Sequence, residues 1–323
     1  MESKKQKVKK TLPQYYGGQA VMEGVMMRGT KGYVVSVRNA EQGIVTVKHP
    51  NAGKAARFPF LKWPVIRGVV SFLQSLVVGM KVISESAELA GLDDITEENP
   101  SKLDVWLEKK FGDKLVDYIM TASVVIALVL GVGLFMLLPA WLSGMIKPLL
   151  GGGHILLSIL EGVMRIVIFL IYILLISRMK EIQRLFGYHG AEHKTLACYE
   201  AGEVLSPENA KKHSRLHKRC GTSFLLIVMV VSMVVFFFVK TETVWLRVIS
   251  RVLLVPVIAG LSYELLRWAG RHDNTLVNII SAPGLMLQKM TTAEPDDGML
   301  EVAIEALKGV LADETADAGS TEA

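Results

Sequence analysis

The chain has 323 residues, of which 51% are hydrophobic, and its mean hydropathy is +0.37. These apolar residues are gathered into a few long runs, which argues against a soluble globular protein. The formal net charge of +5 can indicate nucleic-acid binding, but an excess of Lys and Arg on the inner side of a membrane produces the same balance. We therefore expect the lipid bilayer, and not a nucleic acid, as the partner.

The N-terminal part, residues 1–62, is expected to contain a small β-hairpin. Its first ten residues are basic but lead into no apolar core, so we expect no cleaved secretory peptide. Two runs of alternating polarity, Tyr33–Arg38 and Ile44–Lys48, are separated by a turn-forming segment. This alternation is typical of paired strands.

A Gly-rich segment, Gly17–Gly29, precedes the hairpin. Its glycines permit tight turns, and Glu23 and Arg28 are the only charged residues in it. We expect the segment to form a tight turn in which these two residues pair with each other.

Residues 63–117 predict cytosolic or interfacial helices. Residues 63–90 have helical period, but the apolar stretch from 65 to 80 contains Arg67 and Gln74. Because these polar groups are costly inside a bilayer, we expect this stretch to lie at the interface or to re-enter the membrane. Residues 91–113 are acidic and then amphipathic, which predicts a linker and a cytosolic helix.

Four apolar runs between residues 118 and 269 predict membrane spans. The first is uncharged for 24 positions, about 36 Å of helix, against about 30 Å for a hydrocarbon core. The second contains Glu161 and Arg165, which lie four residues apart and can neutralise each other. The fourth has only 12 uncharged residues, so its flanks must snorkel. The four runs are Ile119–Leu142, 155–177, Gly221–Val239 and Val252–Tyr263.

The distribution of basic residues predicts the orientation. Lys and Arg are frequent in residues 1–70 and in the loop 178–222, whereas residues 143–154 contain only Lys147. The positive-inside rule then places both termini and this loop in the cytosol. Thiols stay reduced there, so we expect no disulfide between Cys198 and Cys220.

The C-terminal part divides into two segments. Residues 270–311 are expected to be amphipathic and interfacial, and the stretch 275–288, which contains Pro283, is expected to be interfacial or re-entrant. Residues 312–323 are small and acidic, which predicts a disordered tail.

Four of the seven histidines and both cysteines lie between His189 and Cys220. His189, Glu192 and His193 form a His-x-x-Glu-His pattern, which places two imidazoles one helical turn apart beside a carboxylate. This arrangement is found in metalloproteases of the inverted type, where the Glu takes a proton from water. Glu200 lies two turns further along the same helix face, where it could be a ligand or an orienting group.

A second group of candidate ligands follows. Ser206 and the proline after it are typical of a helix start, and we expect a short helix at about 207–219. His213, His217 and Cys220 would then share one face and meet the first group at one ion. Zinc or iron would suit such a mixed site, and zinc is favoured for tetrahedral His/Cys sites in a reducing compartment. The candidate metal ligands are His189, His193, His217, Cys220 and Glu200.

Other interpretations remain open. The cluster could be polar surface beside the lipid headgroups, without a metal. Cys220 could be a nucleophile with His217 as its base, since the neighbouring Lys218 and Arg219 would favour the thiolate. A transporter could use Glu161, and Glu264 could line the same cavity as the cluster.

Three segments resemble the bacterial YqhQ-type family, a group with a domain of unknown function: GGQAVMEGVMMRG, YHGAEHKTLACYE with LHKRCGTSFL, and APGLMLQKMTTAEPDDGMLEVAIEAL. The resemblance covers most of residues 14–308 and implies a membrane protein, sometimes labelled a metal-dependent enzyme, in the bacterial cytoplasmic membrane. Lys218 departs from the proline expected there, and His213 lies outside the matching block. The matching candidate positions are Glu23, Arg28, His189, Glu192, His193, Glu200, His217, Arg219, Cys220, Gln288 and Glu294.

The leading hypothesis is a membrane-embedded, zinc-dependent enzyme, most plausibly a hydrolase at the cytosolic face. Glu192 would be its general base and Arg219 a further catalytic candidate. The alternative is a non-enzymatic assembly or scaffold factor with a closed structural metal site.

Overall fold

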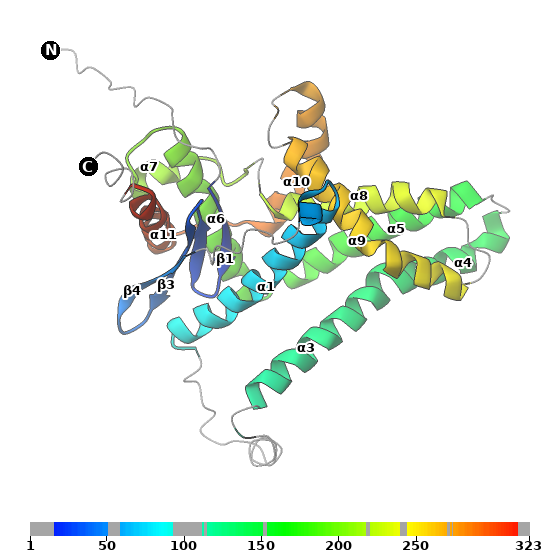
Figure 1. Ribbon diagram of the computed structural model, residues 1–323, viewed down its shortest axis with the longest axis horizontal. Coiled ribbons are helices and arrows are strands. Elements are labelled where there is room, and N and C mark those ends of the chain that lie inside the picture. Colours follow the sequence, from blue (N-terminus) through cyan, green and yellow to red (C-terminus); the bar gives the residue numbers. More distant parts are fainter. Residues whose placement is uncertain are drawn as a thin grey trace.

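The computed structural model describes residues 16–50, 59–92, 115–150, 154–217, 220–239, 244–269 and 274–315, together with Gly112 and His272. Its strands gather with α6 (Lys180–Glu200), α7 (Pro207–Lys211) and α11 (Asp297–Thr315) at one end of the molecule, and long apolar helices extend away from them (Figure 1). We call this end the sheet unit. The predicted helix within residues 91–113 and the last eight residues lie outside the described part.

The sheet is antiparallel, with the order β1-β2-β3-β4. The predicted hairpin is present as β3 and β4, but the Gly-rich segment before it also forms one, joined at Met22 and Glu23. Glycine is required at Gly24, because a Cβ atom there would lie 2.3 Å from the Ser36 carbonyl oxygen. The strands are β1 (Gly17–Val21), β2 (Gly24–Arg28), β3 (Gly32–Asn39) and β4 (Gly43–Pro50).

Each face of the sheet packs against helices. One face carries Val25, Met27 and Val34, which pack with Leu300 and Leu307 of α11 in the largest buried cluster. The other face packs Val21, Met26, Val35 and Val37 around Val82 of α1 (Ile66–Leu89). Strand alternation sends successive side chains to opposite faces, so both clusters come from the same few strands.

The end of α11 corrects the predicted tail. The helix continues to Thr315, so residues 312–315, which we expected to be disordered, are helical. Glu314 holds this end against the sheet, since its Oε1 accepts hydrogen bonds from the Thr30 backbone (2.9 Å) and hydroxyl (2.8 Å).

Four helical segments are long and apolar enough to cross a membrane, and the chain is a multi-pass helical membrane protein. Three of them correspond to predicted spans. The third predicted span is a shorter apolar helix of 17 residues, α8 (Thr222–Phe238). The four segments are Ile66–Leu89, Thr121–Ile146, Ile155–Ile176 and Ile249–Ala269.

The remaining one of these four is α1, which we expected to be interfacial or re-entrant. It is one continuous helix of 24 residues, and its length and composition would also allow it to cross a membrane. Its polar Arg67 is satisfied by a two-pronged ion pair with Glu264 of α9 (Val244–Ala269). Gly68 lies against Gly260, so the two helices approach closely there.

The other helices complete the apolar region. The stretch 275–288, which we expected to be interfacial or re-entrant, is a continuous helix despite Pro283, and it packs on α8 where Gly284 meets Ser223. The first apolar run is a helix with one π-helical turn, η3 (Gly133–Leu137). The bounds are α3 (Leu115–Val132), α4 (Leu138–Leu150), α5 (His154–Ile176) and α10 (Thr275–Thr291).

Glu161 and Arg165 do pair, as predicted, but as part of a larger buried network. Arg251 of α9 binds the same carboxylate, with its Nη2 2.8 Å from Glu161 Oε2. Arg165 also donates to the Ser232 hydroxyl and to the Phe135 carbonyl oxygen, both at 2.8 Å. Phe135 lies in the π-helical turn, where the altered hydrogen-bond ladder makes a carbonyl available. The network joins α5, α8 and α9 and holds two positive charges against one negative charge.

Candidate metal centre

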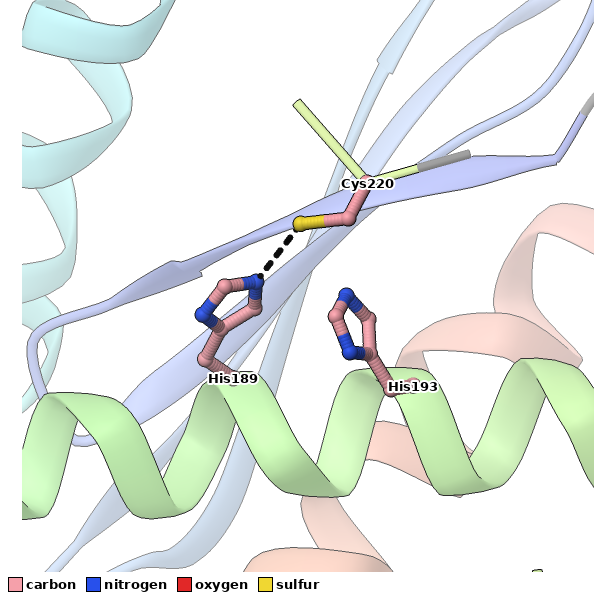
Figure 2. Close-up of side chains that lie close together, drawn as sticks. All are labelled: His189, His193 and Cys220. Carbon is pink, nitrogen blue, oxygen red and sulfur yellow. Dashed lines mark hydrogen bonds between the residues drawn. The ribbon is translucent and has the colours of Figure 1, made fainter. Parts of the chain in front are cut away.

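His189 and His193 lie on the same face of α6 and point toward Cys220, which immediately precedes α8 (Figure 2). One ligand atom from each of the three residues lies within 4.8 Å of the other two. The helical spacing thus places the two imidazoles together, as predicted, and the segment before α8 brings the Cys220 thiol next to them. His193 is 1% exposed and Cys220 is 7% exposed, so water covers little of this group.

The hydrogen bonds of the two histidines fix which ring nitrogens are free. His189 Nδ1 lies 2.8 Å from the Thr291 carbonyl oxygen, and His193 Nδ1 lies 2.5 Å from the Arg215 carbonyl oxygen. Because a carbonyl oxygen only accepts, both Nδ1 atoms must carry the proton. The Nε2 atoms then present lone pairs, and His193 Nε2 is buried with no hydrogen-bond partner among the described residues. Metal-binding histidines are held in this way.

Burial and the neighbouring His189 lower the pKa of His193 to about 3. The imidazole is therefore neutral at physiological pH, which is the form that binds metals.

Cys220 is buried beside His189, with Sγ 3.2 Å from His189 Nε2 and 3.0 Å from the Thr222 hydroxyl. Burial and the Glu192 carboxylate raise the pKa of this thiol to about 11. In the surroundings that the described residues supply, the group is a neutral thiol at pH 7. This disfavours the free-thiolate nucleophile, because the thiolate is the reactive form.

Glu192 is buried beside the same group. A Cβ atom at Gly18 of β1 would lie 2.8 Å from Glu192 Cγ, so glycine is needed there for the carboxylate to fit against the strand. Burial raises the pKa of Glu192, while His189, His217 and the Gly18 backbone N–H oppose this shift. A carboxylate with a raised pKa is suited to accept a proton near neutral pH.

His217 reaches this neighbourhood by a route that the sequence did not predict. The expected helix at 207–219 begins at Ser206, whose hydroxyl accepts from the Asn209 backbone at 3.3 Å, but it ends at Lys211. The His217 ring centroid lies 5.6 Å from that of His193, and its Nε2 is 3.5 Å from Glu200 Oε2. Glu200 therefore contacts His217 and is not part of the His189, His193 and Cys220 group.

Gln288 positions the main chain at His217. Its Oε1 accepts from the His217 backbone N–H at 2.8 Å, and its Nε2 donates to the His217 carbonyl oxygen at 2.9 Å. Gln288 is fully buried, on α10, and also donates to Ser223 at 3.1 Å. It thus links the loop to the start of α8.

Glu294 acts on the neighbouring part of this loop. Its carboxylate lies 2.9 Å from Lys194 Nζ and 3.4 Å from Arg215 Nε. Arg215 supplies the carbonyl oxygen that fixes His193, so the ion pairs of Glu294 help to hold the loop that positions this histidine. Sequence reasoning missed Arg215, Thr291 and Gly18, because main-chain carbonyls and a missing Cβ leave no side-chain signature.

The other predicted residues lie elsewhere. His213 forms a separate group with Cys198 and Glu203, which corrects its expected place on a shared helix face. Glu23 pairs with Arg184 of α6 and not with Arg28, and Glu264 pairs with Arg67. Lys218 and Arg219 lie outside the described residues.

The group of candidate ligands forms one wall of a cavity of about 780 Å³. The cavity runs along β1, the edge strand, between α1 and α6, and reaches the ends of α5 and α8. Of the residues singled out from the sequence, Arg28, His189, Glu192, His193, His217 and Cys220 line it, whereas Glu23, Glu264 and Glu294 do not. The lining also includes Gly18, Met26, Val78, Ile173, Ile176, Phe186 and Leu225.

Comparisons with known proteins agree on the kind of chain. The family model described as "Protein of unknown function (DUF1385)" matches residues 63–313. The chain is 36% identical over 305 residues to "Uncharacterized protein YqhQ" of Bacillus subtilis (strain 168), with 94% of each chain covered. No solved structure matches.

Proposed function

Since the chain belongs to the DUF1385 family of proteins of unknown function, its chemistry must be argued from its own residues, and we propose that it is a zinc-dependent hydrolase of the cytoplasmic membrane. His189, His193 and Cys220 would hold the metal. The observation that carries the proposal is the pair of histidines, both fixed through Nδ1 by main-chain carbonyls, with His189 Nε2 3.2 Å from the Cys220 thiol and His193 Nε2 buried without a partner among the described residues.

Three protein ligands favour a catalytic site over a structural one, because structural zinc sites have four. Zinc supplies Lewis acidity and makes a nearby water molecule a better acid. Glu192 would accept a proton from that water, and the remaining hydroxide would add to the electrophilic carbon or phosphorus of the substrate. The leaving group would then depart with the proton that Glu192 returns, so that one water is consumed for each bond cleaved.

The orientation follows the basic residues. We place the sheet unit and the metal centre in the cytosol, because the Lys and Arg residues concentrate in the N-terminal part and in the loop 178–222. Crossings by the four runs predicted from the sequence, including α8 but not α1, then also put both termini there.

Hydrolysis can be tested without knowing the substrate, because it transfers oxygen from water to a product. Purified protein is incubated with membranes from cells that lack it, in water enriched in oxygen-18, and extracts are analysed by mass spectrometry. We expect labelled products with the wild-type protein and a decrease of about 100-fold or more with Glu192→Gln, since general-base catalysis contributes about 10²–10⁴-fold.

The control is the metal content of Glu192→Gln, which is expected to equal that of the wild-type protein. If no labelled product depends on the protein, or if Glu192→Gln is as active as the wild type, the hydrolase proposal is wrong. A protein that binds metal in both forms but produces no label would instead support the scaffold alternative, with His217 beside His193 as the candidate fourth ligand.

A further inference from the structure

Arg28 is a cation at the cavity whose side chain pairs with no acidic residue in the described part of the chain. It is the last residue of β2, it is exposed, and it lines the cavity. In the described part of the chain its side chain has neither an ion pair nor a hydrogen bond, because the predicted partner, Glu23, binds Arg184. An unpaired guanidinium at the mouth of a pocket is suited to bind a phosphate or carboxylate.

Part of the cavity wall is apolar. Val78 of α1, Ile173 and Ile176 of α5 and Leu225 of α8 contribute to its wall. Helices α1 and α5 are candidate membrane spans, and α8 is the shorter apolar helix. The cavity thus lies where the apolar helices meet the sheet unit. If these helices lie in the bilayer, a lipid can enter the cavity from the bilayer without crossing water.

The size of the cavity fits a ligand larger than an ion. Its volume of about 780 Å³ lies within the range of roughly 300–1,000 Å³ found for small-molecule sites. A water or an inorganic anion at Arg28 would leave most of this apolar wall unoccupied.

We propose that the cavity binds an anionic amphiphile, a membrane lipid whose headgroup pairs with Arg28 while an acyl chain lies among Val78, Ile173 and Leu225. The bound lipid would be the substrate class of the proposed hydrolase, so its turnover rests on that proposed function. Binding of the lipid does not depend on hydrolysis. A lipid bound in this way passes the wall formed by His189, His193, Glu192 and Cys220.

The test uses the full-length protein in phosphatidylcholine vesicles that contain a small amount of a photoreactive lipid. The probe is phosphatidylglycerol with a diazirine on its acyl chain, and the comparison probe is phosphatidylcholine with the same chain. After illumination, labelled peptides are identified by mass spectrometry. We expect phosphatidylglycerol to label the peptides that contain Ile173, Ile176 and Leu225.

Arg28→Gln is expected to reduce this labelling about tenfold, the size expected for loss of one hydrogen-bonded charge, and Arg28→Lys is expected to retain part of it. The matched control is Arg178→Gln, which removes an exposed cation at the end of α5 that does not line the cavity. It is expected to leave the labelling unchanged. The phosphatidylcholine probe is expected to be insensitive to all three changes.

Equal labelling of these peptides by both probes, or labelling by phosphatidylglycerol that Arg28→Gln does not reduce, would overturn the proposal. A photoreactive extended peptide, which could pair with the edge strand β1, serves as a competing probe. Stronger labelling of the same protein peptides by this probe than by phosphatidylglycerol would also overturn the proposal. The metal content of Arg28→Gln is expected to equal that of the wild type, because Arg28 is not one of the grouped candidate ligands. A failure of lipid binding is therefore distinguishable from a failure of the metal or hydrolase proposals.

Discussion

Replacement of both His189 and His193 by alanine is expected to yield a protein that purifies without its metal. The wild-type protein should carry about one zinc per chain, as three protein ligands and an open position imply. The double variant retains only Cys220, whose pKa is raised by burial to about 11. A lone neutral thiol does not hold zinc, so the metal content, measured by elemental mass spectrometry after gel filtration, should fall to the background level.

The second group of possible ligands supplies the control. Cys198, Glu203 and His213 also place ligand atoms within 4.8 Å of one another. His213 Nε2 lies 3.3 Å from Glu203 Oε2, and the Cys198 thiol lies 3.6 Å from the Val204 carbonyl oxygen, so all three of these groups already have partners. Cys198→Ser with His213→Ala should therefore leave the metal content unchanged. If this variant loses the metal and the His189 and His193 variant keeps it, the metal binds at the second group and not at the first.

Glu161→Gln is expected to produce the largest loss of stability. Among the described residues its carboxylate is the only acidic group in the network with Arg165 and Arg251, and all three side chains are less than 10% exposed. Removing it leaves two buried guanidinium groups with no counter-charge. Breaking a buried pair in this way costs about 3–5 kcal/mol, which corresponds to a decrease of about 4–7 °C in the Tm of a chain of this size. Thermal unfolding in detergent measures it.

Two further variants separate charge from packing. Arg251→Met leaves Glu161 and Arg165 as a neutral pair, so it should destabilise the protein much less than Glu161→Gln. Glu301→Gln breaks the exposed pair with Arg38, and such pairs contribute only about 0–1 kcal/mol. If Arg251→Met lowers the Tm as much as Glu161→Gln does, the charge balance of the network is not what stabilises it.

The apolar helices could largely be predicted from the sequence, because the cost of burying charge in lipid leaves long uncharged runs. For α1 the sequence could not show how its charge is neutralised, since the partner of Arg67 is Glu264, 197 residues later. Nothing local shows that this charge is neutralised. The first hairpin was missed because β1 begins with two glycines, which hide the alternation of side chains.

The candidate site could also be predicted only in part from the sequence. His189, Glu192 and His193 could be placed together, because helical period alone puts them on one side of α6. The loop from 212 to 217 could not be predicted. Its main-chain groups pair with distant residues, including His193, Lys194 and Gln288, and these bonds replace those of the expected helix. Such tertiary competition leaves no local pattern.

The most direct test of the metal centre is X-ray absorption at the zinc edge on the purified wild-type protein. The proposal predicts one sulfur neighbour at about 2.3 Å and two nitrogen neighbours at about 2.0–2.1 Å, with the sulfur contribution absent from Cys220→Ser. Protein that carries no zinc, or a zinc shell without sulfur in the wild type, would contradict the site formed by His189, His193 and Cys220.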